Sequence, residues 1–439
     1  MFERPESGER AVLVHVNFPG GSDHEDLEEF TELVHSAGAV PVATVTATRT
    51  TPEPRLFIGS GKAGEILAAV RHNDADLVIF NHSLSPSQER NLERFLSCRV
   101  LARTGLILDI FAQRARSFEG KLQVELAQLH HMSTRLVRGW THLERQKGGI
   151  GLRGPGETQL ESDRRMLNAR IKVINRRLEK VEKQRDQGRR ARQRADVPTV
   201  ALVGYTNAGK STLFNSLTGS RAFVADQLFA TLDPTLRRID VPGVGAMVLA
   251  DTVGFIRHLP HELVAAFRAT LEETCKADLL LHVIDVQDRE KDAHIDQVNE
   301  VLREIDAQDI PQIRVYNKID LAETGPRMES SGDGRINKVW VSAVTGAGLD
   351  LLAEALTDHF QGAQVHGWLQ LPPTAGGTRS SLYGIGQVLS EHVDEQGNWL
   401  LEVCMAQRNL DKLLRETGAG SSFHAAEKAD FLAGTAQAS

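Results

Sequence analysis

The stretch that most constrains the fold is Gly-Tyr-Thr-Asn-Ala-Gly-Lys-Ser at residues 204–211. It follows the apolar run 199–203 and precedes a helix-like run at 212–217, so Gly-x-x-x-x-Gly-Lys-Ser stands in the strand–loop–helix context of a phosphate-binding loop. Glycines let backbone N–H groups turn towards phosphate oxygens, and a helix N-terminus adds partial positive charge. Lys210 can reach the β- and γ-phosphates, and the Ser211 hydroxyl can bind Mg²⁺. The alternative is a chance glycine turn, which four motifs downstream argue against.

Two of those motifs can complete the phosphate end of a site. The segment 229–235, Phe-Ala-Thr-Leu-Asp-Pro-Thr, precedes a predicted strand, and both Thr231 and Thr235 have the spacing of a Mg²⁺ ligand. Asp251-Thr-Val-Gly254 ends another predicted strand, where Asp251 can hold the Mg²⁺ shell and the Gly254 N–H can bond the γ-phosphate. Because hydrolysis removes the γ-phosphate, such a contact predicts a switch.

The other two motifs predict recognition of guanine. Asn317-Lys-Ile-Asp320 follows a strand, and the Asp320 carboxylate can accept hydrogen bonds from guanine N1–H and the exocyclic amine. Adenine offers neither donor and would leave that carboxylate unpaired, which discriminates strongly. The Lys318 stem can pack on the base, and Ser342-Ala-Val344 can bring backbone N–H groups to the guanine carbonyl. Taken in order, the five motifs are expected to meet at the carboxyl edge of an α/β sheet, where such sheets bind ligands. The pattern predicts a guanine-nucleotide hydrolase.

One position departs from small signalling GTPases, which place a water-orienting Gln after the glycine of the third motif. Here that residue is Phe255, whose ring cannot orient water. We therefore expect slow intrinsic hydrolysis, with a partner surface or another residue of the chain completing the site. This favours a regulated switch over a metabolic GTPase.

Charge is unevenly distributed along the chain. The net charge is −7, yet residues 134–194 hold 18 Lys and Arg against 7 Asp and Glu. An acidic protein with one basic stretch favours a local contact with a polyanion, of which nucleic acid is the leading candidate. The three cysteines lack metal-ligand spacing, and neither a signal core nor an apolar run of membrane-spanning length occurs, so a reducing cytosol is expected.

The basic stretch overlaps two runs of apolar residues at heptad-like spacing. The first is Leu122, Leu126, Leu129, Ser133 and Leu136, and the second is Leu167, Ile171, Ile174, Leu178 and Val181. Two such helices joined by one loop predict an antiparallel hairpin whose apolar seams face each other. The joining segment 139–156 holds six glycines, and its side chains include Trp140, His142, Arg145, Lys147 and Arg153. Aromatic and cationic groups on a flexible backbone suit RNA, and a mobile linker is the alternative.

The remaining regions carry weaker signals. Residues 1 to about 116 alternate strand and helix patterns, which predicts a small, mostly parallel sheet. Gly59-Ser-Gly-Lys-Ala-Gly64 lies there, and it is either a second nucleotide or RNA-phosphate site or a tight turn capping a helix. After residue 361, two runs flanking Asp394–Asn398 predict a hairpin, followed by a tail beyond 417 that we expect to be disordered.

Four segments closely resemble the bacterial HflX family of ribosome-associated GTPases: 204–211, 229–235, 251–256 and the loop Gly-Gly-Ile-Gly-Leu-Arg-Gly-Pro-Gly-Glu-Thr at 148–158. The resemblance covers roughly residues 10 to 360, and the glycine loop is its most specific part. It implies a monomer that binds the large ribosomal subunit, near the peptidyl-transferase region, and splits or rescues stalled ribosomes under stress such as heat. It also implies that Thr231, and not Thr235, is the Mg²⁺ ligand.

The sequence thus predicts an α/β protein in four parts. They are an N-terminal α/β domain (1–116), a basic helical hairpin with a Gly-rich loop (117–197), a P-loop GTP-binding domain with a mostly parallel sheet (198–361), and a small α+β unit with a disordered tail (362–439). GTP is the expected substrate and Mg²⁺ the cofactor, with Lys210, Thr231 and Gly254 catalytic, and Ser211 and Thr231 on the metal. The residues predicted to bind nucleotide are Gly204, Tyr205, Thr206, Asn207, Ala208, Gly209, Lys210, Ser211, Phe229, Ala230, Thr231, Leu232, Asp233, Asp251, Thr252, Val253, Gly254, Asn317, Lys318, Ile319, Asp320, Ser342, Ala343 and Val344.

The expected partner is the large (50S) ribosomal subunit with its rRNA, and the expected location is the cytoplasm with a minor membrane-associated fraction. Two other functions compete with this one. The first is a membrane- or protein-associated signalling GTPase whose basic hairpin binds anionic lipid or an acidic partner. The second is an RNA-remodelling enzyme that uses Gly59–Gly64 as an adenine-nucleotide site.

Overall fold

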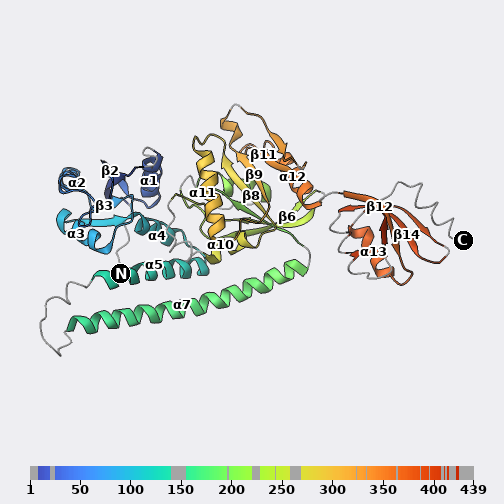
Figure 1. The fold of residues 1–439 in the computed structure, drawn as a ribbon, viewed down its shortest axis with the longest axis horizontal. Coiled ribbons are helices and arrows are strands. Elements are labelled where there is room, and N and C mark those ends of the chain that lie inside the picture. Colours follow the sequence, from blue (N-terminus) through green and yellow to red (C-terminus); the bar gives the residue numbers. More distant parts are fainter. Residues whose placement is uncertain are drawn as a thin grey trace. The chain divides into compact units, whose positions relative to one another are not determined.

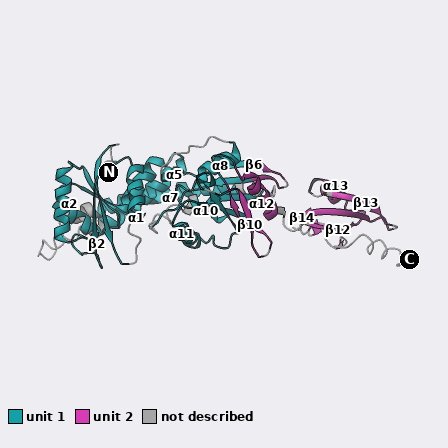
Figure 2. Ribbon diagram, turned by 90° about the horizontal axis from the view of Figure 1, so that it is seen from above, with its two compact units in different colours: residues 1–238, 248–324, 342–346 teal, residues 239–247, 325–341, 347–439 magenta. Residues whose placement is uncertain are grey.

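The computed structural model describes residues 8–19, 25–139, 155–194, 197–219, 228–242, 244–257, 268–322, 324–332, 334–361, 364–385, 387–394, 396–406, 410, 413–414 and 422–424. The chain forms two compact units (Figure 2). The first comprises residues 1–238, 248–324 and 342–346, and the second comprises residues 239–247, 325–341 and 347–439. Most of the predicted Gly-rich loop and of the predicted C-terminal tail lie outside the described residues.

The first unit begins with a parallel sheet, as the alternating pattern predicts (Figure 1). Its elements are β1 (Arg10–Asn17), α1 (Glu25–Ser36), β2 (Val40–Thr48), α2 (Ser60–His72), β3 (Leu77–Phe80), α3 (Pro86–Leu96), β4 (Arg99–Ala102) and α4 (Arg103–Arg114). The strand order is β2-β1-β3-β4, and all three pairings are parallel. The sequence did not predict β4 or α4, because the strand is four residues long and runs into the helix without a turn residue.

Helices cover both faces of this sheet, which explains why β1 and β3 read as continuous apolar runs. All six residues from Ala11 to Val16 and all four residues of β3 are buried. Local sequence starts α3: the Ser85 Oγ accepts the Gln88 N–H at 3.2 Å, the Gln88 side chain accepts the Ser85 N–H at 2.9 Å, and Pro86 occupies the first turn. This capping box satisfies two N–H groups that the helix itself cannot.

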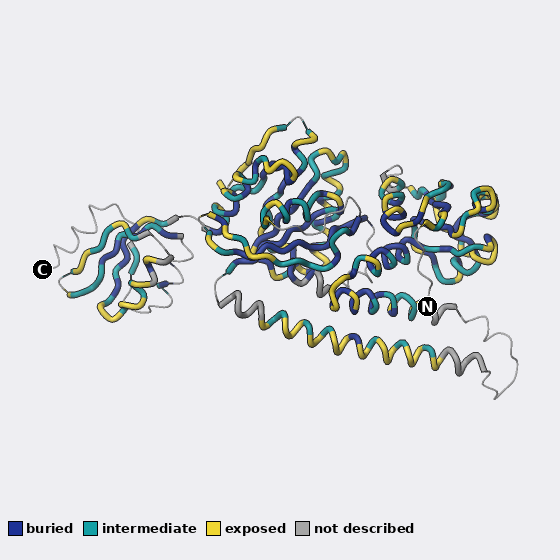
Figure 3. The backbone as a smooth tube through the Cα atoms, turned by 180° about the vertical axis from the view of Figure 1, so that it is seen from behind, coloured by how far each residue is buried: buried dark blue, intermediate teal, exposed yellow. Residues whose placement is uncertain are grey.

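The predicted helical hairpin consists of α5 (Phe118–Gly139) and α7 (Pro155–Arg194). Leu122, Leu126, Leu129 and Ile174 form its buried seam, with Leu167, Ile171 and Leu178 packed against them. Ion pairs fix the antiparallel direction, because Glu125 pairs with Arg170 at 2.6 Å whereas Glu119, nearer the start of α5, pairs with Arg185 at 2.9 Å. Most other described residues of α7 are exposed (Figure 3).

A second parallel sheet in the first unit carries the motifs. Its strands in that unit run in the order β9 (Gln312–Asn317), β8 (Leu279–Asp285), β5 (Thr199–Val203) and β7 (Gly245–Asp251), and all three pairings are parallel. The accompanying elements are α8 (Lys210–Thr218), β6 (Thr235–Val241), α10 (Arg268–Cys275), α11 (Lys291–Glu304) and the short 3₁₀ helix η1 (Ile319–Leu321). Four of the five motifs follow strands, as the sequence analysis predicted, whereas the segment 229–235 leads into the start of β6.

The second unit contains β10 (Arg327–Ser330) paired antiparallel with β11 (Ile336–Trp340), followed by α12 (Leu349–Gln361). An antiparallel sheet in the order β13-β14-β12-β15 comes next. It is formed by β12 (Gln364–Leu371), β13 (Gln387–Val393), β14 (Trp399–Ala406) and β15 (Ser422–His424), with α13 (Gly376–Ile385). The hairpin predicted around Asp394 is present, because β13 and β14 pair across that turn. The predicted α+β class of this region is confirmed, although β12 and α13 were not predicted individually.

Candidate functional site

The phosphate-binding loop has the backbone conformation that its glycines predict. Gly204 has φ +145°, and a Cβ there would lie 2.2 Å from the carbonyl oxygen of Val283. Gly209 has φ +90°, and a Cβ there would lie 2.3 Å from the Asn317 Nδ2. Asn207, with φ +60°, adopts the left-handed conformation that asparagine tolerates better than most residues. No other residue type could replace either glycine without moving a neighbouring strand or loop.

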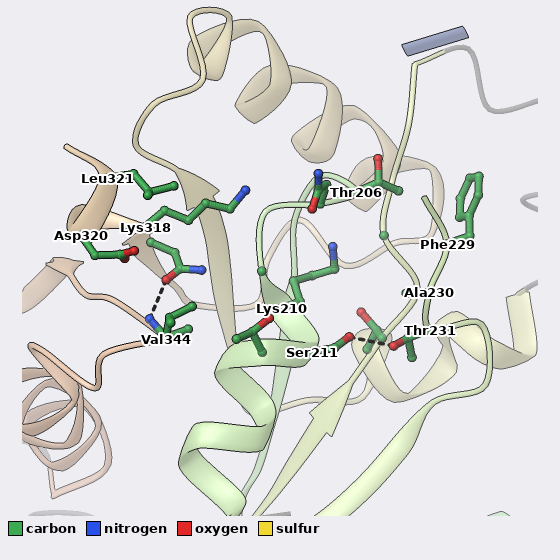
Figure 4. Close-up of a pocket in the computed structure, with 17 residues that line it drawn as sticks. Thr206, Lys210, Ser211, Phe229, Ala230, Thr231, Lys318, Asp320, Leu321 and Val344 are labelled. Atoms are coloured by element: carbon green, nitrogen blue, oxygen red, sulfur yellow. Dashed lines mark hydrogen bonds between the residues drawn. The ribbon is translucent and has the colours of Figure 1, made fainter. Parts of the chain in front are cut away.

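The loop opens onto a cavity of about 310 Å³ (Figure 4). Residues from all five motifs line it, so the structure brings together segments more than a hundred residues apart. The lining residues are Thr206, Asn207, Gly209, Lys210, Ser211, Thr212, Phe229, Ala230, Thr231, Thr252, Gly254, Asn317, Lys318, Asp320, Leu321, Ala343 and Val344.

Lys210 is the cation at the phosphate end. Its side chain is buried, and the Nζ donates a hydrogen bond to the Tyr205 carbonyl at 2.6 Å. Burial lowers the pKa of Lys210 to about 8, and the Asp251 carboxylate only partly offsets this effect. A buried ammonium with one neutral partner is well suited to bind phosphate oxygens, because they would supply the charge compensation that it lacks.

Three oxygens beside Lys210 fit a Mg²⁺ ion. The Ser211 Oγ lies 2.7 Å from the Thr231 Oγ1 (Figure 4). These two hydroxyls lie 2.8 Å and 3.0 Å from the Asp251 Oδ2. Adjacent ligands of octahedral Mg²⁺ lie about 3 Å apart, because its bonds to oxygen are about 2.1 Å long. Burial also raises the pKa of Asp251, and its Oδ1 is buried without a hydrogen-bond partner. These hard oxygen donors would hold Mg²⁺, which would neutralise charge on the phosphates. Thr235 instead begins β6.

Gly254 and Phe255 are neighbours with different roles: the first lies beside the cavity and the second packs in the core. A Cβ on Gly254 would lie 2.9 Å from both the Lys210 Nζ and the Thr206 Cα, so only glycine leaves this backbone open to the cavity. The Phe255 side chain is 2% exposed and packs in the hydrophobic core. Its backbone exchanges hydrogen bonds with the loop, from its N–H to the Gly204 carbonyl at 3.2 Å and from the Thr206 N–H to its own carbonyl at 2.8 Å. Phe255 therefore anchors this segment and does not reach the reacting phosphate.

The guanine end is held together by Asn317. Its Nδ2 donates to the Ala208 carbonyl at 2.9 Å, and its Oδ1 accepts the Ala343 N–H at 2.9 Å, so one side chain links the phosphate loop to the fifth motif. The Ser342 hydroxyl donates to the Asp320 Oδ1 at 2.5 Å and orients that carboxylate beside the cavity. The left-handed backbone of Lys318, with φ +67°, directs its stem along the cavity wall, and its Nζ pairs with Asp285 at 2.7 Å.

Fifteen of the predicted nucleotide-binding residues line the cavity, and nine do not. Gly204, Ala208, Asp251, Ile319 and Ser342 are buried. Leu232 and Val253 belong to a hydrophobic core cluster against which Tyr205 packs, and Asp233 bonds to residues just before α5. Thr212 and Leu321 were not predicted, although each directly follows a predicted motif, and that adjacency is the signal that would have found them.

The second glycine motif, Gly59–Gly64, starts α2 with Gly59 as its N-cap. A Cβ at Gly59 would meet the Arg49 guanidinium at 2.2 Å, whereas Gly61 and Gly64 face open space. In a dinucleotide fingerprint the last glycine permits close packing of helix on strand, and nothing here requires that. The geometry favours a helix-capping turn.

Comparison with known proteins agrees with this geometry. Residues 24–112 match the family "GTP-binding GTPase N-terminal", residues 114–192 match "GTP-binding GTPase Middle Region", and residues 199–318 match "50S ribosome-binding GTPase". The chain is 61% identical to the GTPase HflX of Escherichia coli (strain K12) over 406 residues, which cover 92% of this chain and 95% of that protein. The chain belongs to the HflX family of GTPases.

Two further similarities are more distant. The GTPase HflX of Magnetococcus marinus is 48% identical over 81% of this chain and 83% of its own length. Among solved structures, the GDP complex of SsGBP aligns with a TM-score of 0.46 and 26% identity, covering 80% of this chain and 98% of that chain. Membership of the HflX family fixes the reaction as hydrolysis of GTP to GDP and phosphate. Within it, Lys210 and the loop amides would bind the phosphates and Asp320 would select guanine.

Proposed function

We propose that this HflX-family GTPase binds the large (50S) ribosomal subunit, hydrolyses Mg²⁺-bound GTP in a ribosome-stimulated manner, and splits or rescues ribosomes under stress such as heat. The proposal also makes the protein a cytoplasmic monomer with a minor fraction at the membrane. Its GTPase segment matches a family described as 50S ribosome-binding. None of the described helices is both long and apolar enough to span a bilayer.

The observation that carries this proposal is the outward face of α7. Eight of its described basic residues are exposed, and seven of these lie outside the ion pairs with α5: Arg164, Arg165, Lys172, Arg176, Arg177, Lys180 and Lys183. Arg170 and Arg185, in contrast, pair with acids of α5. A row of unburied cations along one rigid helix can follow a phosphate backbone, which gives affinity without sequence specificity.

The proposed stimulation follows from the buried ring of Phe255. Because that side chain lies in the core, the chain supplies no glutamine at the usual position for orienting the attacking water. A ribosomal surface could supply the missing group or could order the segments that hold Thr231 and Gly254. In this scheme GTP orders both segments, and hydrolysis then releases the protein from the ribosome.

Pelleting with purified 50S subunits tests this proposal. We expect co-sedimentation with a non-hydrolysable GTP analogue, less with GDP, and GTP turnover that rises when subunits are added. The double variant Arg176→Glu with Arg177→Glu should reduce both binding and stimulation while leaving isolated turnover unchanged. Arg237→Glu with Arg238→Glu changes an equally exposed pair on β6 and serves as the control. Equal sedimentation in every nucleotide state would remove the switch.

Sucrose gradients separate the finer role from its alternatives. A splitting factor should convert 70S ribosomes into subunits when GTP is present, and loss of the gene should slow recovery from heat stress. Competition between rRNA and anionic vesicles distinguishes the ribosome from a lipid surface as the partner of α7. Vesicle binding that rRNA cannot displace would favour a membrane-associated signalling GTPase.

A further inference from the structure

The segment from Leu228 to Asp233 contacts the nucleotide site and the start of the hairpin at the same time. Thr231 points to Ser211 and Asp251, as described above. Two residues later, the Asp233 carboxylate turns the other way, and its Oδ2 accepts the N–H groups of Arg116 at 2.8 Å and Ser117 at 2.7 Å. Its Oδ1 accepts the hydroxyl proton of Ser117. Asp233 therefore pairs the two backbone N–H groups that immediately precede α5.

The sequence of α5 is adapted to this contact. The Ser117 Oγ accepts the Gly120 N–H at 2.8 Å, so the serine caps the helix while it also binds Asp233. A Cβ at Gly120 would lie 2.0 Å from the Asp233 Oδ1. Glycine is unfavourable inside a helix, and here it gives the carboxylate room to approach. This glycine is independent evidence that α5 is built to receive Asp233.

Apolar contacts hold the same segment on both sides of Thr231. Leu228, Phe229 and Leu232 are buried in a core cluster shared with α4 and α5. The Phe229 ring meets the Phe111 ring of α4 edge-on, with centroids 4.6 Å apart. The Leu228 N–H also donates to the Ser36 Oγ at 3.1 Å. The segment is thus a short bridge with one end at the metal-binding oxygens and the other on helices of the N-terminal part.

We propose that Asp233 is a positioning residue: by capping α5 it holds Thr231 over the Mg²⁺ site, and it couples the nucleotide state to the start of the hairpin. Two residues of chain span at most about 7 Å, so Thr231 stays within that distance of Asp233 as long as Asp233 remains bonded to Ser117. Coupling of this kind is reciprocal. GTP, which engages Thr231, should order the first turn of α5, and a well-capped α5 should favour GTP over GDP. Transmission onward to ribosomal RNA rests on the proposed function, whereas the coupling itself does not.

The test uses the full-length protein without ribosomes. Affinities for a non-hydrolysable GTP analogue and for GDP are measured with Mg²⁺ for Asp233→Asn and for Ser117→Ala. Each variant should weaken binding of the GTP analogue by about five- to tenfold, the factor of a lost helix cap. GDP binding should change less than about twofold, since GDP lacks the phosphate that Thr231 senses. Ser117→Thr keeps the hydroxyl and should restore the preference.

Two controls separate coupling from general loss of stability. Ser85→Ala removes the cap of α3, which does not contact the Leu228–Asp233 segment in any described hydrogen bond, and should leave the ratio of the two affinities unchanged. In a Thr231→Ala background, Asp233→Asn should have no further effect on that ratio. Equal weakening of both nucleotides, or effects of Asp233 and Thr231 that simply add, would overturn the proposal and leave the cap purely structural. Absence of ribosome binding would refute the proposed function and leave this result intact.

Discussion

Raising the pH from 7 to 9 should weaken GDP and GTP binding, because the buried Lys210 loses its charge in this range. Burial lowers its pKa from 10.5 to about 8, and the Lys318 charge adds to the effect while the Asp251 carboxylate opposes it. The ammonium form pairs with phosphate oxygens, and the neutral amine does not. A lowered pKa means that the free protein releases this proton as pH rises through about 8, so affinity falls above that value.

The size of the effect follows from that pKa. If only the protonated form of Lys210 binds phosphate, the apparent Kd is proportional to 1 + 10^(pH − 8). That factor is about 1.1 at pH 7 and about 11 at pH 9, a tenfold loss or about 1.4 kcal/mol. A lysine titrating at its ordinary pKa of 10.5 would lose only a few per cent of its charge over the same range.

Calorimetry measures both the affinity and the proton balance. At pH 8, binding should take up about half a proton per nucleotide, which appears as a dependence of the heat on the ionisation enthalpy of the buffer. Guanosine is the matched control, because it occupies the base end without touching Lys210. Its pH dependence therefore reports ionisation of the base. Equal pH dependence for guanosine and GDP, or a flat GDP profile, would refute the reasoning.

Four substitutions test other parts of the site. Gly204→Ala would place a Cβ 2.2 Å from the Val283 carbonyl, at φ +145°, so we expect thermal unfolding to show a loss of roughly 3 kcal/mol or more. Phe255→Gln should not raise GTP turnover, since this side chain points into the core; it should instead cost roughly 3 kcal/mol in urea unfolding. Faster turnover would show that the residue can face the phosphate. Asp320→Asn should lower the preference for guanine over xanthine nucleotides in competition binding, and Ser342→Ala should do so more weakly, because it removes only the bond that orients the carboxylate.

The parts of the structure that the sequence predicted are those fixed by local physics. Gly204 and Gly209 identify the phosphate-binding loop in the sequence, because the backbone conformation and close contacts at these two positions exclude other residue types. The seam of the hairpin follows from apolar spacing along a helix, and the start of α3 follows from Ser85 with Pro86 in the first turn. In each case the partner is a few residues away, or any apolar partner would do.

The parts that it could not predict depend on one particular distant partner. Asp233 looks like a nucleotide-binding residue because it lies within a nucleotide-binding motif, yet its carboxylate bonds to residues 116 and 117. At position 255 the sequence shows only that the usual glutamine is replaced by phenylalanine. The structure shows that the Phe255 ring anchors the segment after Gly254 in the core. Neither contact has a spacing or a composition that a sequence can display, since both arise from packing of elements far apart in the chain.

Tyr205 extends this point to the second nucleotide-sensing segment. Its hydroxyl donates to the Glu29 carboxylate and accepts the Arg257 N–H at 2.9 Å. Arg103 pairs with Glu29 and donates to the Arg257 carbonyl at 2.9 Å. Both backbone groups of Arg257, three residues after Gly254, are therefore held by a network that includes two side chains of the N-terminal sheet domain. Asp233 holds the other segment onto α5. The segments that carry Thr231 and Gly254 therefore each have a polar anchor in the first 120 residues, so the α/β domain and the start of the hairpin form a platform for the GTP site.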